Sequence, residues 1–208
     1  MSAEVFSGIA GSYDRINRIL SLGQDQNWRR RVVDELPSGR ILDLGAGTGA
    51  ANEIFGSRSV VGLDPAPEML ALNRADHRVV GFGEYLPFAD ATFDAVFSAY
   101  VVRNLASVAA TVIEIARVLK PGGAAGIVDL GRPQNKAAAT IHRMGSAVTL
   151  HTVGFLVGAH SEYAYLHRSL DKLPRPEVLY ADLPLTIERV WRMGPLGFVY
   201  GIILRKPQ

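Results

Sequence analysis

The residues best suited to chemistry lie in one glycine-rich stretch that contains a single acid. Residues 41–49 read Ile-Leu-Asp-Leu-Gly-Ala-Gly-Thr-Gly, an apolar run that breaks into a turn. Glycine allows backbone conformations that a Cβ would forbid, and it lets a ligand approach the main chain closely. The helix predicted to start near Ala50 offers free backbone N–H groups to such a ligand. The stretch therefore predicts a site for a nucleotide-type cofactor.

Two cofactors fit this glycine pattern. Gly45, Gly47 and Ala50 have the spacing of a dinucleotide fingerprint, and Asp64 follows about twenty residues later, where a ribose-binding acid is expected. This pattern would suit NAD and an oxidoreductase. S-adenosylmethionine (SAM) is the alternative, because Asp43 would repel a pyrophosphate but attract the cationic methionyl end of SAM. The glycine spacing alone leaves both cofactors open.

Strands and helices must alternate along the chain to position these groups. Apolar residues at three- and four-residue spacing predict helices over residues 5–22, 25–36 and 106–120. Short apolar runs predict seven strands, at residues 41–44, 60–64, 78–82, 92–99, 124–130, 185–192 and 198–204. This order predicts an α/β fold with a doubly wound, mostly parallel seven-stranded sheet and an antiparallel C-terminal strand pair. Ligands bind such sheets beyond the carboxyl ends of the strands.

Composition is that of an ordinary globular enzyme. The 208 residues are 48% hydrophobic and 20% charged, with a formal net charge of only +2, so nothing indicates nucleic acid as a partner. The absence of cysteine excludes disulfides, thiolate catalysis and cysteine-ligated metals, and it fits a cytoplasmic location. The N-terminus lacks the basic and apolar regions of a signal peptide. We expect one domain, with N-terminal helices (1–36), a cofactor-binding core (39–131), a helical lid (132–175) and a terminal strand pair (176–208).

Four stretches carry a resemblance to one protein family. They are residues 6–29, which include Tyr13, Asp14 and Trp28-Arg29; residues 42–49; residues 84–94, which include Leu86-Pro87-Phe88; and residues 103–123, which include Arg103-Asn104 and Lys120-Pro121-Gly122-Gly123. With these motifs the chain resembles the ubiquinone/menaquinone-biosynthesis C-methyltransferase family, whose members are class I SAM-dependent methyltransferases. The N-terminal motif and Arg103-Asn104 are the discriminating part. Beyond residue 131 the match is thin.

The resemblance implies SAM as the cofactor and a small hydrophobic molecule as the substrate. The implied reaction is C-methylation of a prenylated (hydro)quinone of the demethylmenaquinone or demethoxyubiquinone type. Arg103 would stabilise the deprotonated hydroxyl, Asn104 would orient it, and Tyr13 and Asp14 would close the site and position the ring. The candidate cofactor-binding residues are Asp43, Gly45, Gly47, Thr48, Gly49, Asn52, Asp64, Met69, Phe82, Gly83 and Ala99.

Three residues depart from the family pattern. Phe82 and Gly83 stand where an acidic or amide residue and an alanine usually occur, the polar one reaching the adenine amino group. Ala99 stands where a serine is usual. We therefore expect backbone groups or ring stacking to recognise adenine. Two alternatives share the SAM residues: an O- or N-methyltransferase of another small molecule, and a non-catalytic SAM-binding module.

Residues 133–173 are expected to form one or two helices over the crevice. Between Met144 and Ala159 no residue carries a formal charge, which indicates either a buried helix or an apolar lid for a prenylated substrate. The histidines between residues 142 and 167 lack a known ligand spacing, so no metal is expected. The charge run Arg29–Arg31 is typical of a solvated helix face, with a peripheral membrane-surface contact or an anionic substrate as the alternatives.

Overall fold

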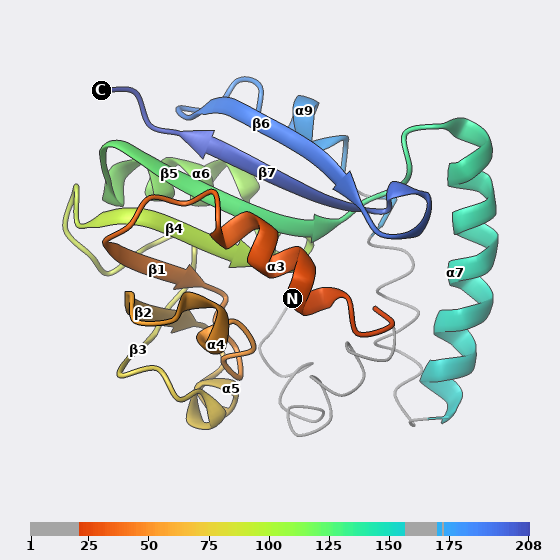
Figure 1. The fold of residues 1–208 in the computed structure, drawn as a ribbon, viewed down its shortest axis with the longest axis horizontal. Coiled ribbons are helices and arrows are strands. Elements are labelled where there is room, and N and C mark those ends of the chain that lie inside the picture. Colours follow the sequence, from red (N-terminus) through yellow and green to blue (C-terminus); the bar gives the residue numbers. More distant parts are fainter. Residues whose placement is uncertain (1–20, 157–169, 172) are drawn as a thin grey trace.

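A seven-stranded sheet forms the centre of the computed structural model, which describes residues 21–156, 170–171 and 173–208 (Figure 1). The strand order is β3-β2-β1-β4-β5-β7-β6. The strands are β1 (Arg40–Leu44), β2 (Ser59–Asp64), β3 (His77–Val80), β4 (Phe93–Ala99), β5 (Leu119–Leu130), β6 (Thr186–Met193) and β7 (Val199–Arg205). β1 to β5 pair in parallel, and β7 runs antiparallel to both β5 and β6. The predicted fold class is confirmed.

Helices connect these strands and cover both faces of the sheet. They are α3 (Asp25–Val33), α4 (Asn52–Phe55), α5 (Pro67–Leu72), α6 (Val108–Val118), α7 (Lys136–Leu156) and α9 (Pro176–Leu179), with 3₁₀ turns η1 (Val102–Asn104) and η2 (Pro195–Gly197). α6 is shorter than predicted. It begins after Ser107, whose hydroxyl oxygen accepts a hydrogen bond from the Ala110 amide, and it ends where Leu119 already starts β5. The first predicted helix falls almost entirely outside the described residues.

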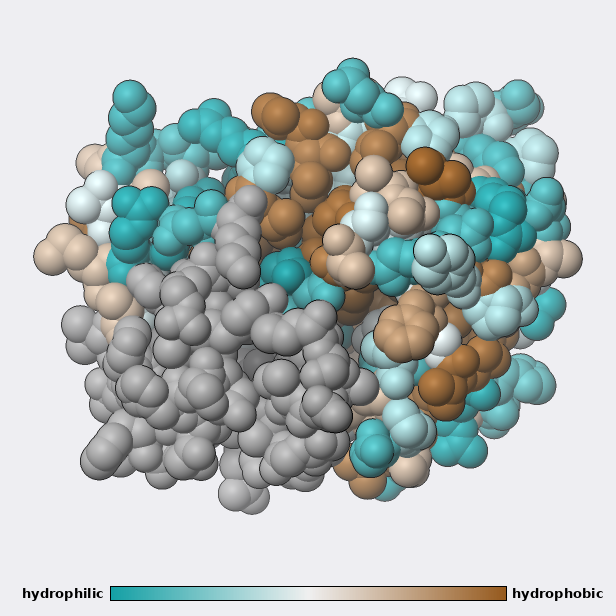
Figure 2. Space-filling model, turned by 180° about the vertical axis from the view of Figure 1, so that it is seen from behind, coloured by the Kyte–Doolittle hydropathy of each residue, from teal (hydrophilic) through white to brown (hydrophobic). Residues whose placement is uncertain are grey.

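The two faces of the sheet carry separate hydrophobic clusters because side chains alternate along each strand. Ile41 of β1 packs in a cluster with Trp28 and Val32 of α3. Its neighbour Leu42 packs in the other cluster, which includes Ile115 of α6. α3 therefore covers one face and α6 the other. Figure 2 shows the molecule from behind, where hydrophobic side chains gather near the upper middle and hydrophilic ones surround them.

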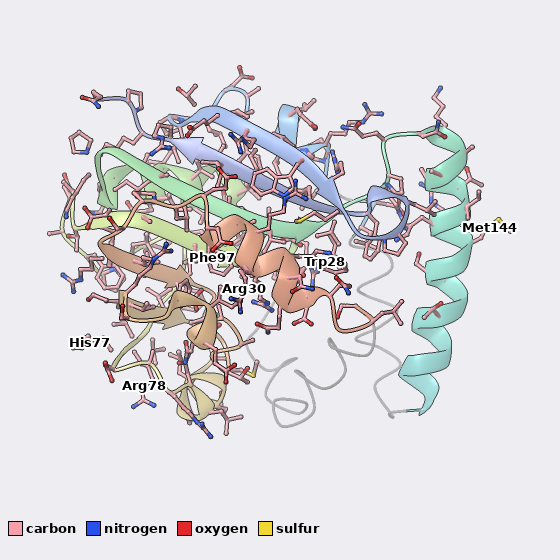
Figure 3. All side chains as sticks on the ribbon, in the orientation of Figure 1. Trp28, Arg30, His77, Arg78, Phe97 and Met144 are labelled. Carbon is pink, nitrogen blue, oxygen red and sulfur yellow. The ribbon has the colours of Figure 1, made fainter. Side chains whose placement is uncertain are left out.

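α7 stands beyond the edge of the sheet at which the parallel strands end (Figure 1). His142 of α7 stacks on Phe198, in the turn between β6 and β7, with ring centroids 4.9 Å apart. Met144 is 68% exposed and projects away from the sheet (Figure 3). In the described residues, no helix combines the length and apolarity needed to cross a membrane.

Candidate functional site

A cavity of about 210 Å³ lies at the carboxyl ends of β1, β2 and β4, since their last residues Leu44, Asp64 and Ala99 all line it. This is where a parallel sheet places a ligand. The predicted site residues in its wall are Gly45, Gly47, Thr48, Asp64, Met69, Phe82, Gly83, Ala99 and Asn104. Tyr13 and Asp14 lie outside the described residues.

The first two glycines of the loop have different structural reasons to be glycine. Gly45 has φ of +75°, and a Cβ there would run into the side chain of Val101. Gly47 has φ of +50°, but a Cβ there would meet only Met69 Cε at 3.5 Å and an Asp64 oxygen at 3.9 Å. Gly45 is therefore required by packing, whereas Gly47 leaves room on the cavity side. A cofactor that lies against the main chain fits this opening.

Asp64 holds the loop and the start of α5 at once. One carboxylate oxygen accepts a hydrogen bond from the Gly47 amide at 2.9 Å, and the other accepts one from the Ala66 amide at 2.9 Å. Burial raises the pKa of Asp64, and these two donors oppose that rise. Each carboxylate oxygen can accept a second hydrogen bond, so both remain suited to the hydroxyls of a ribose. The N-cap residue of α5 is Ala66, so Asp64 is not the helix cap.

Gly49 and Asn52 lie behind the loop, outside the residues that line the cavity. The Asn52 amide donates to Oδ1 of Asn73 at 2.9 Å, and the Asn73 amide donates to the Gly47 carbonyl at 3.2 Å. A Cβ at Gly49 would come within 2.8 Å of Asn73 Oδ1. These contacts fix the loop from its far side. Asn73, which is buried, was not anticipated from the sequence, although an amide at the end of a helix is a signal for such a contact.

Arg29 is the residue of this site that the sequence pattern missed. The solvated-face interpretation of the run Arg29–Arg31 is wrong for Arg29, which is 7% exposed and lines the cavity, and it holds for Arg30 and Arg31, which are exposed. The Arg29 guanidinium lies 4.9 Å from the centre of the Tyr100 ring. Asp43 is buried in β1 and is not among the residues that line the cavity; burial raises its pKa to about 7, and the charge of Arg29 opposes the rise.

Arg103 and Asn104 follow β4 in the turn η1 and take different directions. The Arg103 guanidinium donates to the buried carboxylate of Asp129 at 2.6 Å and is not among the cavity residues. Asn104 does line the cavity, and its Oδ1 is buried without a hydrogen-bond partner in the described residues. Of this predicted catalytic pair, Asn104 is therefore the one that faces the ligand space.

The segment after β3 forms another part of the wall. Phe82 is 61% exposed and lines the cavity, so its ring is available for stacking. Gly83 packs against α6, where a Cβ would lie 3.0 Å from Thr111 Cγ2. Met69 is buried and lines the cavity as well. Among the residues that the structure describes, no cluster of three histidine, aspartate or glutamate side chains suits a metal ion.

Comparison with known proteins agrees with this geometry. Residues 2–183 match the ubiE/COQ5 methyltransferase family. A demethylmenaquinone methyltransferase of Thermus thermophilus is 38% identical in an alignment of 193 positions that covers 85% of this chain and 88% of that protein. A ubiquinone/menaquinone biosynthesis C-methyltransferase UbiE of Geobacter sulfurreducens is 34% identical in an alignment of 194 positions that covers 84% of this chain and 75% of the relative.

Solved structures give the same fold. A chain of the complex that contains the Haloferax volcanii Trm112 methyltransferase activator superposes with a TM-score of 0.66 over 98% of both chains. Its sequence identity is only 19%, so this likeness bears on the fold alone. The sheet order and the position of the cavity are thus features of a known architecture.

Proposed function

Because this chain belongs to the ubiE/COQ5 methyltransferase family, we propose that it methylates a ring carbon of a prenylated hydroquinone. The chain is a SAM-dependent methyltransferase, which decides between the two cofactors that the glycine spacing left open. The observation that carries the substrate proposal is the match of residues 2–183, together with relatives named for demethylmenaquinone and for ubiquinone/menaquinone biosynthesis. A hydroquinone of the demethylmenaquinone or demethoxyubiquinone type is the proposed acceptor.

The cavity residues fit SAM in their chemistry. Asp64 offers two acceptor oxygens for ribose hydroxyls, and Gly47 leaves its cavity side open for the cofactor. Phe82 would stack on the adenine, and Met69, which lines the same cavity, would pack on it. When SAM is bound, its sulfonium supplies an electrophilic methyl group. The protein therefore has to bind, align and desolvate the partner that receives this group.

The substrate side is proposed to lie around η1. A hydroquinone becomes a carbon nucleophile when a hydroxyl loses its proton, and the ring carbon loses its own proton after the C–C bond forms. Asn104 faces this space and can donate its amide N–H to the developing phenolate oxygen. Arg103 lies directly before it and holds the turn through Asp129. We propose Asn104 as the contact to the ring and Arg103 as the residue that positions it.

A prenylated acceptor also implies where the protein works. Such a molecule partitions into the bilayer, so we propose a peripheral contact with the membrane surface. α7 stands beyond the edge of the sheet at which the parallel strands end (Figure 1), and it exposes Ile141 (61%) and Met144 (68%). Sedimentation with phosphatidylglycerol vesicles tests this contact, with the Met144→Ser variant as the comparison. If the wild-type protein and the Met144→Ser variant bind the vesicles equally well, α7 is not the part of the protein that contacts the membrane.

The reaction itself is tested with purified protein and SAM that carries a labelled methyl group. Prenylated naphthohydroquinone and benzohydroquinone acceptors, each unsubstituted at the target carbon, should gain the label on carbon. The matched control is the same acceptor with a methyl group already at that carbon, which should gain none. A product labelled on oxygen would make the protein an O-methyltransferase and would overturn the proposal.

A further inference from the structure

A second cavity, of about 80 Å³, is lined by residues from the end of β5, from β6 and β7, and from the start of α9. Among the described residues, it shares no lining residue with the larger cofactor cavity. Its volume has room for several water molecules, so it suits a small ion rather than a second cofactor. This cavity is therefore separate from the site proposed for methyl transfer.

Every charged side chain that the structure describes in the wall of this cavity is an arginine. The three are Arg132, which follows β5, Arg175, which precedes α9, and Arg192 of β6. The other described residues of the wall are leucines, prolines, a glycine and Tyr200, so no aspartate or glutamate is among them. Because a guanidinium group is not deprotonated in proteins, this wall holds three positive charges and no negative one.

The buried charge of Arg192 has only weak partners. Its side chain is 17% exposed, and its Nε and Nη1 atoms are buried without a hydrogen-bond partner in the described part of the chain. Its Nη2 atom lies 3.4 Å from the carboxylate of Glu177, which is long for a charged hydrogen bond. Its guanidinium lies 5.8 Å from the centre of the Tyr200 ring. A buried cation with such partners is unfavourable unless an anion completes its site.

The other two arginines leave the region with an excess of positive charge. Arg132 forms an ion pair with Asp171 at 2.9 Å, but Asp171 also pairs with Arg143 at 2.9 Å, so one carboxylate serves two arginines. Arg175 donates to the Gln134 carbonyl at 3.1 Å and forms no ion pair with an acid that the structure describes. The arginines here outnumber the acids that pair with them, and an anion in the cavity would restore the balance.

We propose that this cavity binds a phosphate group, held by Arg192 and Arg175 with Arg132 beside them. An arginine fork donates two N–H groups to the oxygens of one phosphate. A tetrahedral anion can accept from several forks at once, whereas a planar carboxylate presents only two oxygens. Phosphate therefore fits a wall of three arginines better than a carboxylate does.

Free phosphate and the headgroup of an anionic phospholipid share this chemistry. The Arg132 guanidinium contacts His142 and Ser146 of α7 at 3.2 Å and 3.1 Å, so the cavity adjoins the helix for which a membrane contact is proposed. The phosphate site goes beyond the proposed function, and only its lipid source rests on that contact. The experiment distinguishes the two sources.

The site is tested by titrating the full chain with inorganic phosphate while its amide NMR signals are followed. The amide of Gly131, which lines the cavity, should shift and saturate, and that of Gly47, in the cofactor cavity, is the internal reference. Acetate should bind at least about ten-fold more weakly, since it offers two oxygens to one fork. Arg192→Gln should weaken phosphate by about 10- to 100-fold, as expected for a lost charged hydrogen bond.

Arg189→Gln is the matched control, because Arg189 lies on the same strand, is 60% exposed, pairs with Glu35 and does not line the cavity. It removes the same charge and should leave the phosphate affinity within about two-fold. Arg175→Gln changes an exposed residue and is the second variant if Arg192→Gln folds poorly. It should weaken phosphate by about two- to five-fold, since an exposed charge contributes less.

Sedimentation with phosphatidylglycerol vesicles identifies the source of the phosphate. If the headgroup is the ligand, Arg192→Gln should sediment less than Arg189→Gln, and inorganic phosphate should release the wild-type protein. If all three proteins sediment equally while Gly131 still reports binding, free phosphate is the ligand, and either result supports the site.

Three results would overturn the inference. They are a shift confined to Gly47, an equal phosphate affinity of the wild-type, Arg192→Gln and Arg175→Gln proteins, and acetate bound as tightly as phosphate. None of them bears on methyl transfer, because these titrations contain neither SAM nor an acceptor. A failure of the proposed function would appear instead in the assay with labelled SAM.

Discussion

The guanidinium of Arg103 lies 2.6 Å from the carboxylate of Asp129, and this ion pair joins the turn after β4 to the end of β5. Asp129 is fully buried and also accepts hydrogen bonds from the amides of Val102 at 2.8 Å and Leu130 at 2.7 Å. The Asp129 carboxylate thus holds the start of η1 and the end of β5 together. The direction in which Asn104 enters the cavity depends on this arrangement.

Replacing Arg103 by lysine should lower turnover by about 10- to 100-fold, because the lysine keeps a charge but cannot keep the same contact with Asp129 and hold the turn. SAM affinity should stay within about two-fold, since Arg103 does not line the cavity. Turnover with a demethylated hydroquinone and calorimetry with SAM measure the two quantities. Arg189→Lys, which alters an exposed ion pair with Glu35, is the control. Full turnover of Arg103→Lys would remove Arg103 from the proposal.

The two loop glycines should respond differently to alanine. Gly45→Ala brings a Cβ into Val101 at a position with positive φ, so it should reduce the free energy of unfolding by about 1–3 kcal/mol. Gly47→Ala shares the positive φ but meets no atom nearer than 3.5 Å, so it should be less destabilising; it should weaken SAM because the new methyl group occupies the cavity side of the loop. Urea denaturation and calorimetry with SAM measure the two effects. A loss of stability at Gly47→Ala as large as that at Gly45→Ala would contradict this distinction.

The strands were predictable because their apolar runs are short, separated by turn residues and interrupted by helices of ordinary length. Parallel pairing then follows from the order of the elements, and the cavity position follows from the sheet. Arg29 was not predictable from its charge, because three successive arginines are typical of a solvated helix face. The position of Arg29 in α3 does indicate burial, since it is adjacent to Trp28 and four residues before Val33, both of which are buried.

Other contacts that could not be predicted from the sequence join segments that are far apart in the chain. Asp129 sits in an otherwise apolar strand, and a carboxylate in such a place requires a buried partner, yet nothing in the sequence selects Arg103 as that partner. The two hydrogen bonds that link Asn52, Asn73 and Gly47 likewise depend on where α5 ends. The periodicity of a sequence predicts local helices and strands, whereas these pairs depend on tertiary packing.

Asp64→Ala should weaken SAM by about 1–3 kcal/mol, since it removes the acceptors for two ribose hydroxyls. It also removes the acceptor for the Gly47 amide, so part of the loss comes from a less ordered loop. Calorimetry gives the affinity, and thermal melting shows whether the fold is retained. Asp76→Ala, at an exposed aspartate just before β3, is the matched control. An unchanged dissociation constant in a folded Asp64→Ala protein would take Asp64 out of the cofactor site.

Phe82→Ala should reduce SAM affinity by about 0.5–1.5 kcal/mol, the size expected for one lost aromatic stacking contact. Stability should hardly change, because the Phe82 side chain is 61% exposed and is not part of either hydrophobic cluster. The comparison variant is Tyr85→Ala, an exposed aromatic residue in the same segment that does not line the cavity. If the two variants bind SAM equally well, the adenine is not stacked on Phe82.

The affinity for SAM should rise with pH up to about pH 7, and Asp43 is the reason. Burial raises the pKa of Asp43 to about 7, so the folded protein holds this proton more tightly than the unfolded chain does, and the stability that Asp43 contributes falls as the pH rises toward that value. A cationic ligand favours the ionised carboxylate, so SAM binding near pH 6 should release a proton. Calorimetry in two buffers of different ionisation enthalpy measures that release. Asp43→Asn should abolish it and flatten the pH dependence, and an unchanged profile in this variant would assign the titration to another group.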